Sequence, residues 1–135
     1  MRVIYQNEVA ECGYACLAMV LTHYGRATEV REISEVRPIS ANGLSITDLY
    51  DVAIDFGLAV QAYQFGASDL AEIKQGSILH VGGSHYVIFE RSRRGYVRVI
   101  DPASGRRRIS MDTFLASVSG YLIECAPTPE MPRVR

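Results

Sequence analysis

One stretch near the start of the chain is the most informative, Gln6-Asn-Glu-Val-Ala-Glu-Cys12-Gly-Tyr-Ala-Cys16-Leu-Ala-Met19. From Cys16 onward it is rich in apolar residues that favour a buried helix. Cys12 lies where the backbone enters this helix, so its thiol meets unpaired backbone N–H groups and the positive end of the helix dipole. Both favour the thiolate, which is the nucleophilic form of cysteine. The stretch therefore predicts a cysteine nucleophile.

The composition is typical of one soluble globular domain. The chain has 135 residues, of which 48% are hydrophobic and 21% charged, and its formal net charge is -1. Such a charge predicts no overall field towards nucleic acid or an anionic membrane. The arginine run at 106–108 is interpreted as a solvated strand or turn. No apolar stretch approaches the roughly 20 residues needed to cross a bilayer, so this fragment is expected to be soluble.

The three cysteines predict neither a disulfide framework nor a metal site. An odd and sparse set is a poor basis for disulfides, and an intracellular setting is expected. Cys-x3-Cys without a second pair of ligands is also a weak zinc signal. We therefore expect no metal and no other cofactor in this domain.

The order of the expected elements predicts an α+β fold. Helical spacing runs over 12–24, Thr28 is expected to cap a short helix ending near Val36, and Ser45 with Asp48 resembles a capping box. The second half changes to the period of strands. Strands are expected at 58–65, 77–81, 85–91, 96–101, 106–110 and 120–125, with short helices at 68–74 and 111–118. This order favours N-terminal helices packed on an antiparallel sheet.

The chain is expected to divide into a folded domain and a tail. Residues 1–125 are predicted to form the domain. Residues 126–135 are rich in proline and polar side chains, which is typical of a linker. We interpret this tail as leading towards a transmembrane region outside the sequence.

A cysteine nucleophile needs a base within hydrogen-bond reach. His23 lies eleven residues along the helix from Cys12, which places it more than about 15 Å away. His85 begins an apolar strand, where a side chain is held rigidly beside a cleft, and it is the candidate base. His80 ends the preceding strand and is interpreted either as a core histidine or as a residue with a direct role.

A carboxylate and an amide complete the candidate site. An antiparallel hairpin across the turn at 93–95 brings Asp101 close to His85, where it can hold the imidazole in one tautomer. Asp101 also begins an Asp-Pro turn, and the two roles are compatible. Gln6 is either a loop residue or a donor to the oxyanion of a tetrahedral intermediate, beside the backbone N–H of Cys12. In role and order this is the papain-type arrangement.

Several ordered motifs resemble the peptidase C39 family, the N-terminal cytosolic peptidase domains of bacteriocin-exporting ABC transporters. The motifs are Gln6-x-Glu8-x-x-Glu11-Cys12-Gly13-x-Ala15-Cys16-Leu17-Ala18-Met19, Tyr24-Gly25, Ile78-Leu79-His80-x4-His85-Tyr86-Val87-Ile88 and Asp101-Pro102-Ala103-x-Gly105. Together they extend over nearly the whole chain, from Met1 to about Cys125. Val81 stands where the family usually has Trp, a departure that concerns the substrate groove.

The resemblance implies a papain-like fold and cleavage of precursor peptides after a Gly-Gly leader end, coupled to export. By motif matching it assigns Cys12 as nucleophile, His85 as base, Asp101 as the orienting carboxylate and Gln6 as the oxyanion donor. It implies a double-glycine precursor as partner, together with transmembrane and ATP-binding domains of the same polypeptide. ATP is expected only in that separate domain, and no nucleic acid is expected. The domain is expected on the cytoplasmic side of the bacterial inner membrane.

Two alternative functions remain at the level of sequence. One is a non-catalytic C39-like domain that only holds substrate, which the presence of Cys12, His85 and Asp101 disfavours. The other is a free-standing papain-like hydrolase or acyl transferase that uses the same triad. Neither the precursor peptide nor the residues of its groove are identified by the sequence.

Overall fold

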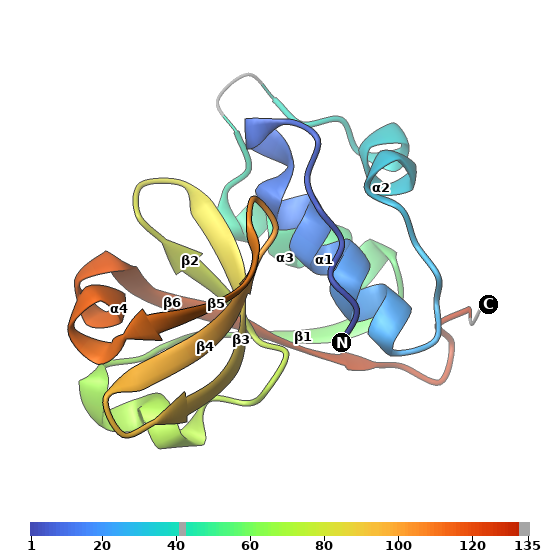
Figure 1. Cartoon of the computed structure of the whole chain (residues 1–135). Coiled ribbons are helices and arrows are strands. Elements are labelled where there is room, and N and C mark those ends of the chain that lie inside the picture. Colours follow the sequence, from blue (N-terminus) through green and yellow to red (C-terminus); the bar gives the residue numbers. More distant parts are fainter. Residues whose placement is uncertain (41–42, 133–135) are drawn as a thin grey trace.

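An antiparallel sheet with helices on both faces forms the domain in the computed structural model, which describes residues 1–40 and 43–132 (Figure 1). Within these residues the helices are α1 (Cys12–His23), α2 (Val30–Val36), α3 (Ile46–Asp55) and α4 (Met111–Ser117), with 3₁₀ turns η1 (Val9–Glu11) and η2 (Ala67–Glu72). The strands are β1 (Leu58–Gln64), β2 (Ile78–Val81), β3 (His85–Arg93), β4 (Tyr96–Asp101), β5 (Gly105–Ser110) and β6 (Val118–Pro127). The expected order, helices first and strands after, is confirmed.

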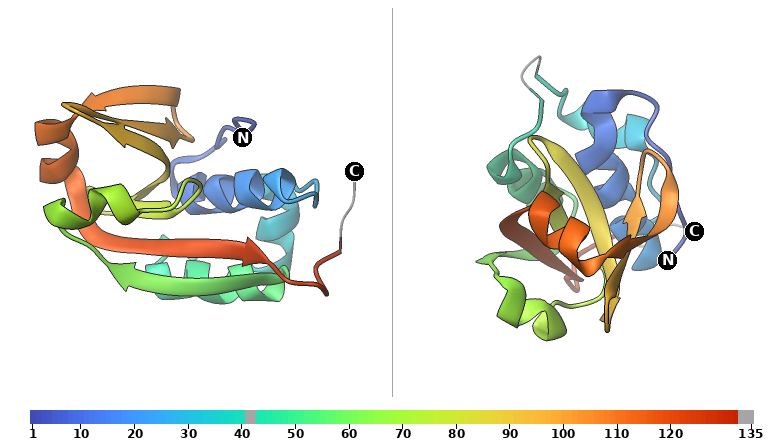
Figure 2. Two further views of the ribbon diagram at one scale, coloured as in Figure 1. Left: turned by 90° about the horizontal axis from the view of Figure 1, so that it is seen from below. Right: turned by 60° about the vertical axis from the view of Figure 1, so that its left-hand side comes forward.

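The strand order across the sheet is β1-β6-β2-β3-β4-β5, and every neighbouring pair is antiparallel. Strands β2 to β5 follow one another as hairpins, while the last strand, β6, lies between β1 and β2. Figure 2 shows the long pair β1 and β6 lying side by side. This topology places the start of β3 and the end of β4 next to the start of α1.

Two apolar cores lie on opposite faces of the sheet. On one face α1 is buried along its length from Cys12 to Leu21, because it is enclosed by the sheet, α2 and α3. A helix that is apolar on all sides is stable only in such a position. The other face carries a second cluster that includes Phe114 of α4 and Leu70 of η2. The first core fixes the position of Cys12 against the sheet.

The capping box expected at Ser45 is confirmed, because its hydroxyl accepts from the backbone N–H of Asp48 at 3.1 Å and Asp48 reaches back to the N–H of Ser45 at 3.3 Å. The cap expected at Thr28 is wrong. The N-cap of α2 is Glu29, and the Thr28 hydroxyl donates instead to the carbonyl of Arg26 at 2.7 Å. The Thr28 side chain therefore stabilises the turn between α1 and α2 and does not cap α2. A 3₁₀ helix, η2 (Ala67–Glu72), is found where a short helix was expected at 68–74.

The sheet continues beyond residue 125, where the folded domain was expected to end. Pro127 pairs with Leu58 at the end of β6, a strand position at which the missing N–H of proline is tolerated. The Thr128 hydroxyl donates to the carbonyl of Gly57 at 2.7 Å, and Met131 is only 2% exposed. The segment 126–131 therefore packs on the domain. No helix within 1–40 and 43–132 is long and apolar enough to cross a bilayer.

Candidate active site

Cys12 is the first residue of α1 and follows directly on the turn η1. The Glu11 carboxylate accepts from the backbone N–H groups of Asn7 and Glu8, both at 2.9 Å, so the backbone enters the helix in a fixed conformation. The Cys12 side chain is 3% exposed. Its Sγ lies 3.7 Å from the carbonyl oxygen of Ser84, the residue just before β3. The predicted position of the thiol at a helix start is confirmed.

Gly13 allows two other segments to approach the helix at this point. A Cβ on Gly13 would lie 2.6 Å from Cδ2 of Leu44 and 3.2 Å from the ring of Tyr86. The Tyr86 hydroxyl in turn donates to the Leu44 carbonyl at 2.8 Å. Any larger residue at position 13 would therefore push the wall formed by Leu44 and Tyr86 away from the thiol.

His85 and Asp101 are in direct contact. His85 Nε2 lies 2.8 Å from Asp101 Oδ1, and Asp101 is 7% exposed. The same oxygen accepts from the backbone N–H of Ala103 at 2.8 Å, and Arg107 Nη1 lies 3.8 Å from Oδ2. The carboxylate is thus held by its own turn and by a neighbouring strand, and it fixes the orientation of the imidazole.

The electrostatics of His85 join it to the thiol as well. Its pKa is raised to about 9, first by a hydrogen bond with Cys12 and then by the hydrogen bond and the negative charge of Asp101, against an opposing effect of burial. Because Nε2 faces Asp101, the other ring nitrogen, Nδ1, is the one left for the thiol. The structure brings Asp101 to His85, as the hairpin argument predicted, and the contact of the Cys12 thiol with the carbonyl of Ser84 places the next residue, His85, close to Cys12.

Gln6 lies beside this group, on the N-terminal segment. Its backbone N–H donates to the carbonyl of Pro102 at 3.0 Å, which ties it to the turn that follows Asp101. Its side-chain Nε2 donates to the Glu8 carbonyl at 3.1 Å and lies 3.5 Å from the carbonyl of Val9. Gln6 Oε1 is buried and has no hydrogen-bond partner among residues 1–40 and 43–132. The amide is thus held against η1, the turn that leads into Cys12.

The other cysteines and histidines lie outside the group of Cys12, His85 and Asp101. Cys16 is fully buried and Cys125 is 9% exposed, and burial raises the pKa of the Cys16 thiol and raises that of Cys125 to about 12. Both are therefore protonated, inert core residues at neutral pH. His23 is exposed at the far end of α1, as predicted. His80 is half-buried, its ring centroid lies 5.1 Å from that of Tyr86, and burial lowers its pKa.

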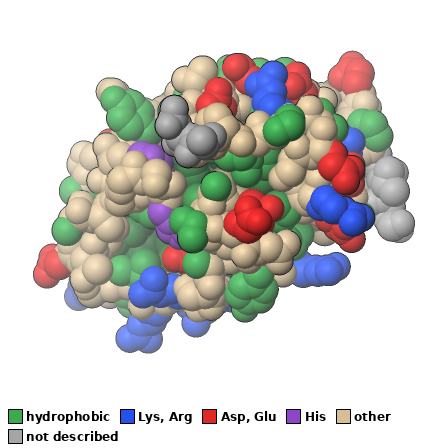
Figure 3. Space-filling model, turned by 90° about the horizontal axis from the view of Figure 1, so that it is seen from above, with side chains coloured by type: hydrophobic (Ala, Val, Ile, Leu, Met, Phe, Trp, Pro, Cys, Tyr) green, Lys and Arg blue, Asp and Glu red, His purple; other side chains and the backbone are tan. Residues whose placement is uncertain are grey.

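A groove of about 610 Å³ opens beside the thiol. It lies between the segment leading into α3 and the hairpin of β2 and β3, and Ser84, whose carbonyl contacts Cys12, forms part of its wall. Figure 3 shows a hollow on this side of the molecule in which histidine side chains are visible. The groove is lined by Ser40, Gly43, Leu44, Ser45, Ile46, Asp48, His80, Gly83, Ser84, Tyr86 and Tyr121.

The sequence alone did not predict most of the residues that line this groove, nor the contact of Arg107 with Asp101. Leu44 and Tyr121 come from segments that no local signal links to Cys12. Tyr86 had a signal, as an aromatic residue directly after the candidate base, and for His80 a direct role was one of two interpretations. Nothing in the arginine run at 106–108 distinguished Arg107 from its neighbours, although its strand was expected directly after the Asp-Pro turn.

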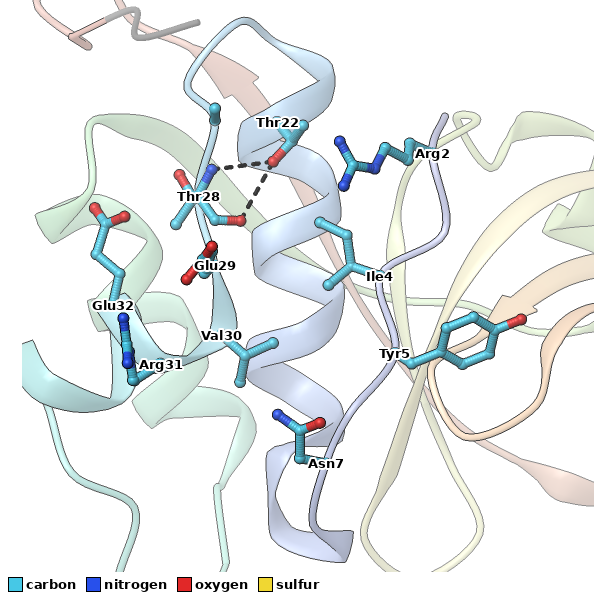
Figure 4. Close-up of a pocket in the computed structure, with 11 residues that line it drawn as sticks. Arg2, Ile4, Tyr5, Asn7, Thr22, Thr28, Glu29, Val30, Arg31 and Glu32 are labelled. Atoms are coloured by element: carbon cyan, nitrogen blue, oxygen red, sulfur yellow. Dashed lines mark hydrogen bonds between the residues drawn. The ribbon is translucent and has the colours of Figure 1, made fainter.

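A second cavity, of about 490 Å³, lies between the N-terminal segment and the connection from α1 to α2. Figure 4 shows Ile4 and Tyr5 on one side and Thr22 and Thr28 on the other. The backbone N–H of Thr28 donates to Thr22 Oγ1 at 3.2 Å, and that hydroxyl lies 3.4 Å from the Thr28 carbonyl. None of Cys12, His85 and Asp101 lines this cavity, so we assign no catalytic chemistry to it.

Comparison with known proteins decides the family. The sequence profile of the Peptidase C39 family matches residues 1–130. The chain belongs to the peptidase C39 family. It is similar to the colicin V secretion/processing ATP-binding protein CvaB of Escherichia coli, with 33% identity over 95% of this chain and 18% of that protein. It is also similar to the probable microcin-H47 secretion/processing ATP-binding protein MchF of Escherichia coli, with 31% identity over 95% and 18%.

The fold of this C39 domain also matches solved structures. A double glycine motif protease from an AMS/PCAT transporter, crystallised in complex with the leader peptide, superposes with a TM-score of 0.86. It shares 29% identity, over 94% of this chain and 91% of that one. The papain-like α+β fold implied by the motifs is thus confirmed. The chain spans about a fifth of the length of the curated relatives named above.

Proposed function

We propose that this C39 domain is a cysteine endopeptidase that cleaves the leader of precursor peptides after a Gly-Gly pair. The observation that carries the proposal is the 2.8 Å contact of His85 with Asp101, directly after Ser84, whose carbonyl lies 3.7 Å from the thiol of Cys12. Such an arrangement activates a cysteine nucleophile and orients its base. The solved relative that is a double glycine motif protease, bound to a leader peptide, supports the substrate class.

Acylation begins when the proton of the Cys12 thiol passes to His85. The thiolate attacks the carbonyl carbon of the second glycine, and the carbonyl oxygen becomes an oxyanion. His85 then gives its proton to the leaving nitrogen, the C–N bond breaks, and the mature peptide departs with a free amino group. The leader remains on Cys12 as a thioester. The pKa of about 9 keeps His85 protonated for the donation at neutral pH.

Water completes the cycle by hydrolysing the thioester. His85 takes a proton from the attacking water and returns it to the sulfur as the C–S bond breaks, which releases the leader carboxylate. In both steps the oxyanion needs donors, and Gln6 with the backbone N–H of Cys12 are our candidates. One side-chain N–H of Gln6 is bonded to Glu8 at 3.1 Å, while the second has only a contact of 3.5 Å to Val9. The second N–H is therefore available to a stronger acceptor.

In this proposal the selectivity for glycine before the cleaved bond is steric. Leu44 and Tyr86 meet over Gly13, directly beside the thiol, and the groove runs away from this contact. A side chain on either residue before the cleaved bond would collide with this wall. Exclusion by shape requires no hydrogen bond to the substrate and rejects every larger residue.

The first test is cleavage of matched precursors by the 135-residue chain. A peptide with a double-glycine leader is expected to be cut only after the second glycine. The same peptide with Val in place of that glycine is expected to react about 100-fold more slowly, because its side chain meets the wall. Mass spectrometry of the products gives the site and the rate. Equal rates, or cleavage at other bonds, would contradict the proposed specificity.

The second test uses the pH dependence of the reaction. Asp101→Asn removes the negative charge that helps to raise the pKa of His85 to about 9. A lower pKa means that His85 loses its proton at lower pH, so the alkaline limb of kcat/KM is expected to move below pH 9. Arg107→Gln leaves the carboxylate in place and is expected to keep the limb near that of the wild type. An unchanged limb in Asp101→Asn would argue against this assignment.

We also propose that the domain works within a transport protein. The support is the nature of the relatives, which are secretion/processing ATP-binding proteins and of which this chain covers 18%. In this proposal the transmembrane and ATP-binding parts belong to the same polypeptide, and ATP binds there and not in this domain. The domain then lies on the cytoplasmic side of the membrane, where precursor peptides are made.

A further inference from the structure

Positive charge is concentrated in one part of this chain. Residues 91–108 contain seven arginines and a single acidic residue, Asp101, which gives that segment a net charge of +6. The rest of the chain has seven Lys or Arg against fourteen Asp or Glu, a net charge of -7, and the two parts together account for the overall -1. A nearly neutral protein therefore has a strongly basic region, and the interpretation of the arginine run as a merely solvated strand is incomplete.

The sheet arranges this charge on one open face. Arg91 on β3 lies directly opposite Arg98 on β4, which lies directly opposite Arg108 on β5. Because side chains alternate along a strand, Arg106 shares the face of Arg108, and Arg93 shares that of Arg91. All five side chains are exposed, and we call them the basic face. The guanidinium of Arg108 lies 4.4 Å from the ring centroid of Tyr96 on the same face.

Most of this charge is not compensated by the protein itself. Arg106 has an ion pair with Glu90, at 3.3 Å. Among residues 1–40 and 43–132, no carboxylate lies within 4.0 Å of the charged groups of the other four arginines. Like charges directly opposite one another on neighbouring strands destabilise a sheet. A row of three arginines across three strands is therefore unfavourable for folding, which points to a partner that supplies negative charge.

The form of the face favours a charged surface over a protein partner. Stable protein interfaces have an apolar centre, but the large exposed apolar side chains Val9, Val36, Ile54, Tyr63 and Tyr121 lie on other elements. Tyr5 alone comes near, with its hydroxyl over Gly105. The hollow on the face is small, about 250 Å³, and is lined by Gln75, Glu90, Arg91 and Arg98. A broad array of arginines with Tyr96 within it and Tyr5 at its border suits an anionic headgroup layer.

We propose that the basic face docks this domain on an anionic phospholipid surface. The inference rests on the proposed function, because a peptidase within a transport protein works next to a membrane. The surrounding charge of -7 is repelled by the same surface, so the two charges together orient the domain. In Figure 3 Lys and Arg side chains gather at the lower left, below the hollow in which histidine side chains are visible. Docking through the basic face leaves the substrate groove open.

The test is sedimentation of the 135-residue chain with vesicles of phosphatidylcholine, with and without phosphatidylglycerol. Binding is expected only to the anionic vesicles and is expected to weaken steeply as salt is added. Each arginine at such a surface contributes about fivefold to the partition coefficient. The triple variant with Gln at Arg91, Arg98 and Arg108 is therefore expected to bind about 100-fold more weakly. None of these three residues is in the catalytic group, so cleavage of a free precursor is expected to be unchanged.

A matched triple variant separates the basic face from net charge. Gln at Arg2, Arg31 and Lys74 removes the same charge from exposed positions outside β3, β4 and β5, and this variant is expected to bind within about threefold of the wild type. Equal losses in the two triple variants would overturn the proposal. So would binding of soluble polyglutamate that depends on the basic face while anionic vesicles are not bound. Cys12→Ala is expected to bind vesicles normally, so failure here and failure of the proposed peptidase activity are separate results.

Discussion

Cys12→Ala is expected to abolish cleavage of a double-glycine precursor, with a fall in kcat of at least about 10⁴-fold. In our mechanism the sulfur forms the covalent bond to the leader, so no other group near His85 replaces it. The side chain is only 3% exposed and the helix start is fixed by Glu11, so the fold is expected to survive the loss of one sulfur atom. Mass spectrometry of a long incubation measures the residual cleavage.

Cys16→Ala is the matched control. It removes the same atom one turn further along α1 from a site that is completely buried. It is expected to cost about 1 kcal/mol of stability through the cavity that it leaves, but to keep activity within about tenfold. Alkylation is expected to be fast at Cys12 and slow at Cys16. Cleavage by Cys12→Ala at the wild-type rate would exclude our mechanism.

The sequence predicted those parts of the site that have a local sequence signal or that a short hairpin brings together. Cys12 precedes an apolar helical run, and one tight turn brings Asp101 back to His85. A register shift between Phe89 and Arg91 alters the pairing of β3 with β4. It does not separate the side chains of His85 and Asp101, because their 2.8 Å contact forms between the start of β3 and the end of β4, away from the shift.

The groove required knowledge of packing that spacing along the chain does not contain. Leu44 reaches the thiol because Gly13 leaves room for it and because Tyr86 bonds its carbonyl. These contacts join segments about 30 and 40 positions apart. Hydrophobic periodicity indicates which face of an element is buried, but not which distant segment covers it. Tyr121 enters the groove for the same reason, from the last strand.

Charge distribution is a second property that the sequence concealed. A net charge of -1 predicts no overall field, yet the register of β3, β4 and β5 places Arg91, Arg98 and Arg108 in one row. The net charge determines the electrostatic field far from a protein. A partner in contact with the surface interacts mainly with the charges within about one Debye length of it. The same register that forms the basic face also carries Arg107 to Asp101. The two features are therefore built from neighbouring positions of one strand.

His85→Ala is expected to lower kcat by about 10³-fold to 10⁴-fold, because it removes both the base for the thiol and the acid for the leaving nitrogen. It is also expected to remove the alkaline limb. In the wild type the imidazolium persists up to its pKa of about 9, so activity is expected to hold below that pH and to fall above it. A variant without this group has no such proton to lose, and its residual rate is expected to show no fall near pH 9.

His80→Gln is the control for this variant, since it replaces the neighbouring histidine, five positions earlier. His80 lines the groove, and burial lowers its pKa from the usual value, so His80 is neutral in the alkaline range in which His85 loses its proton. The change is expected to raise KM by a few fold through lost contact with the peptide. Its alkaline limb is expected to stay near pH 9, because the Cys12–His85–Asp101 group is intact. If His80→Gln lost the limb and His85→Ala kept it, the roles of the two histidines would have to be exchanged.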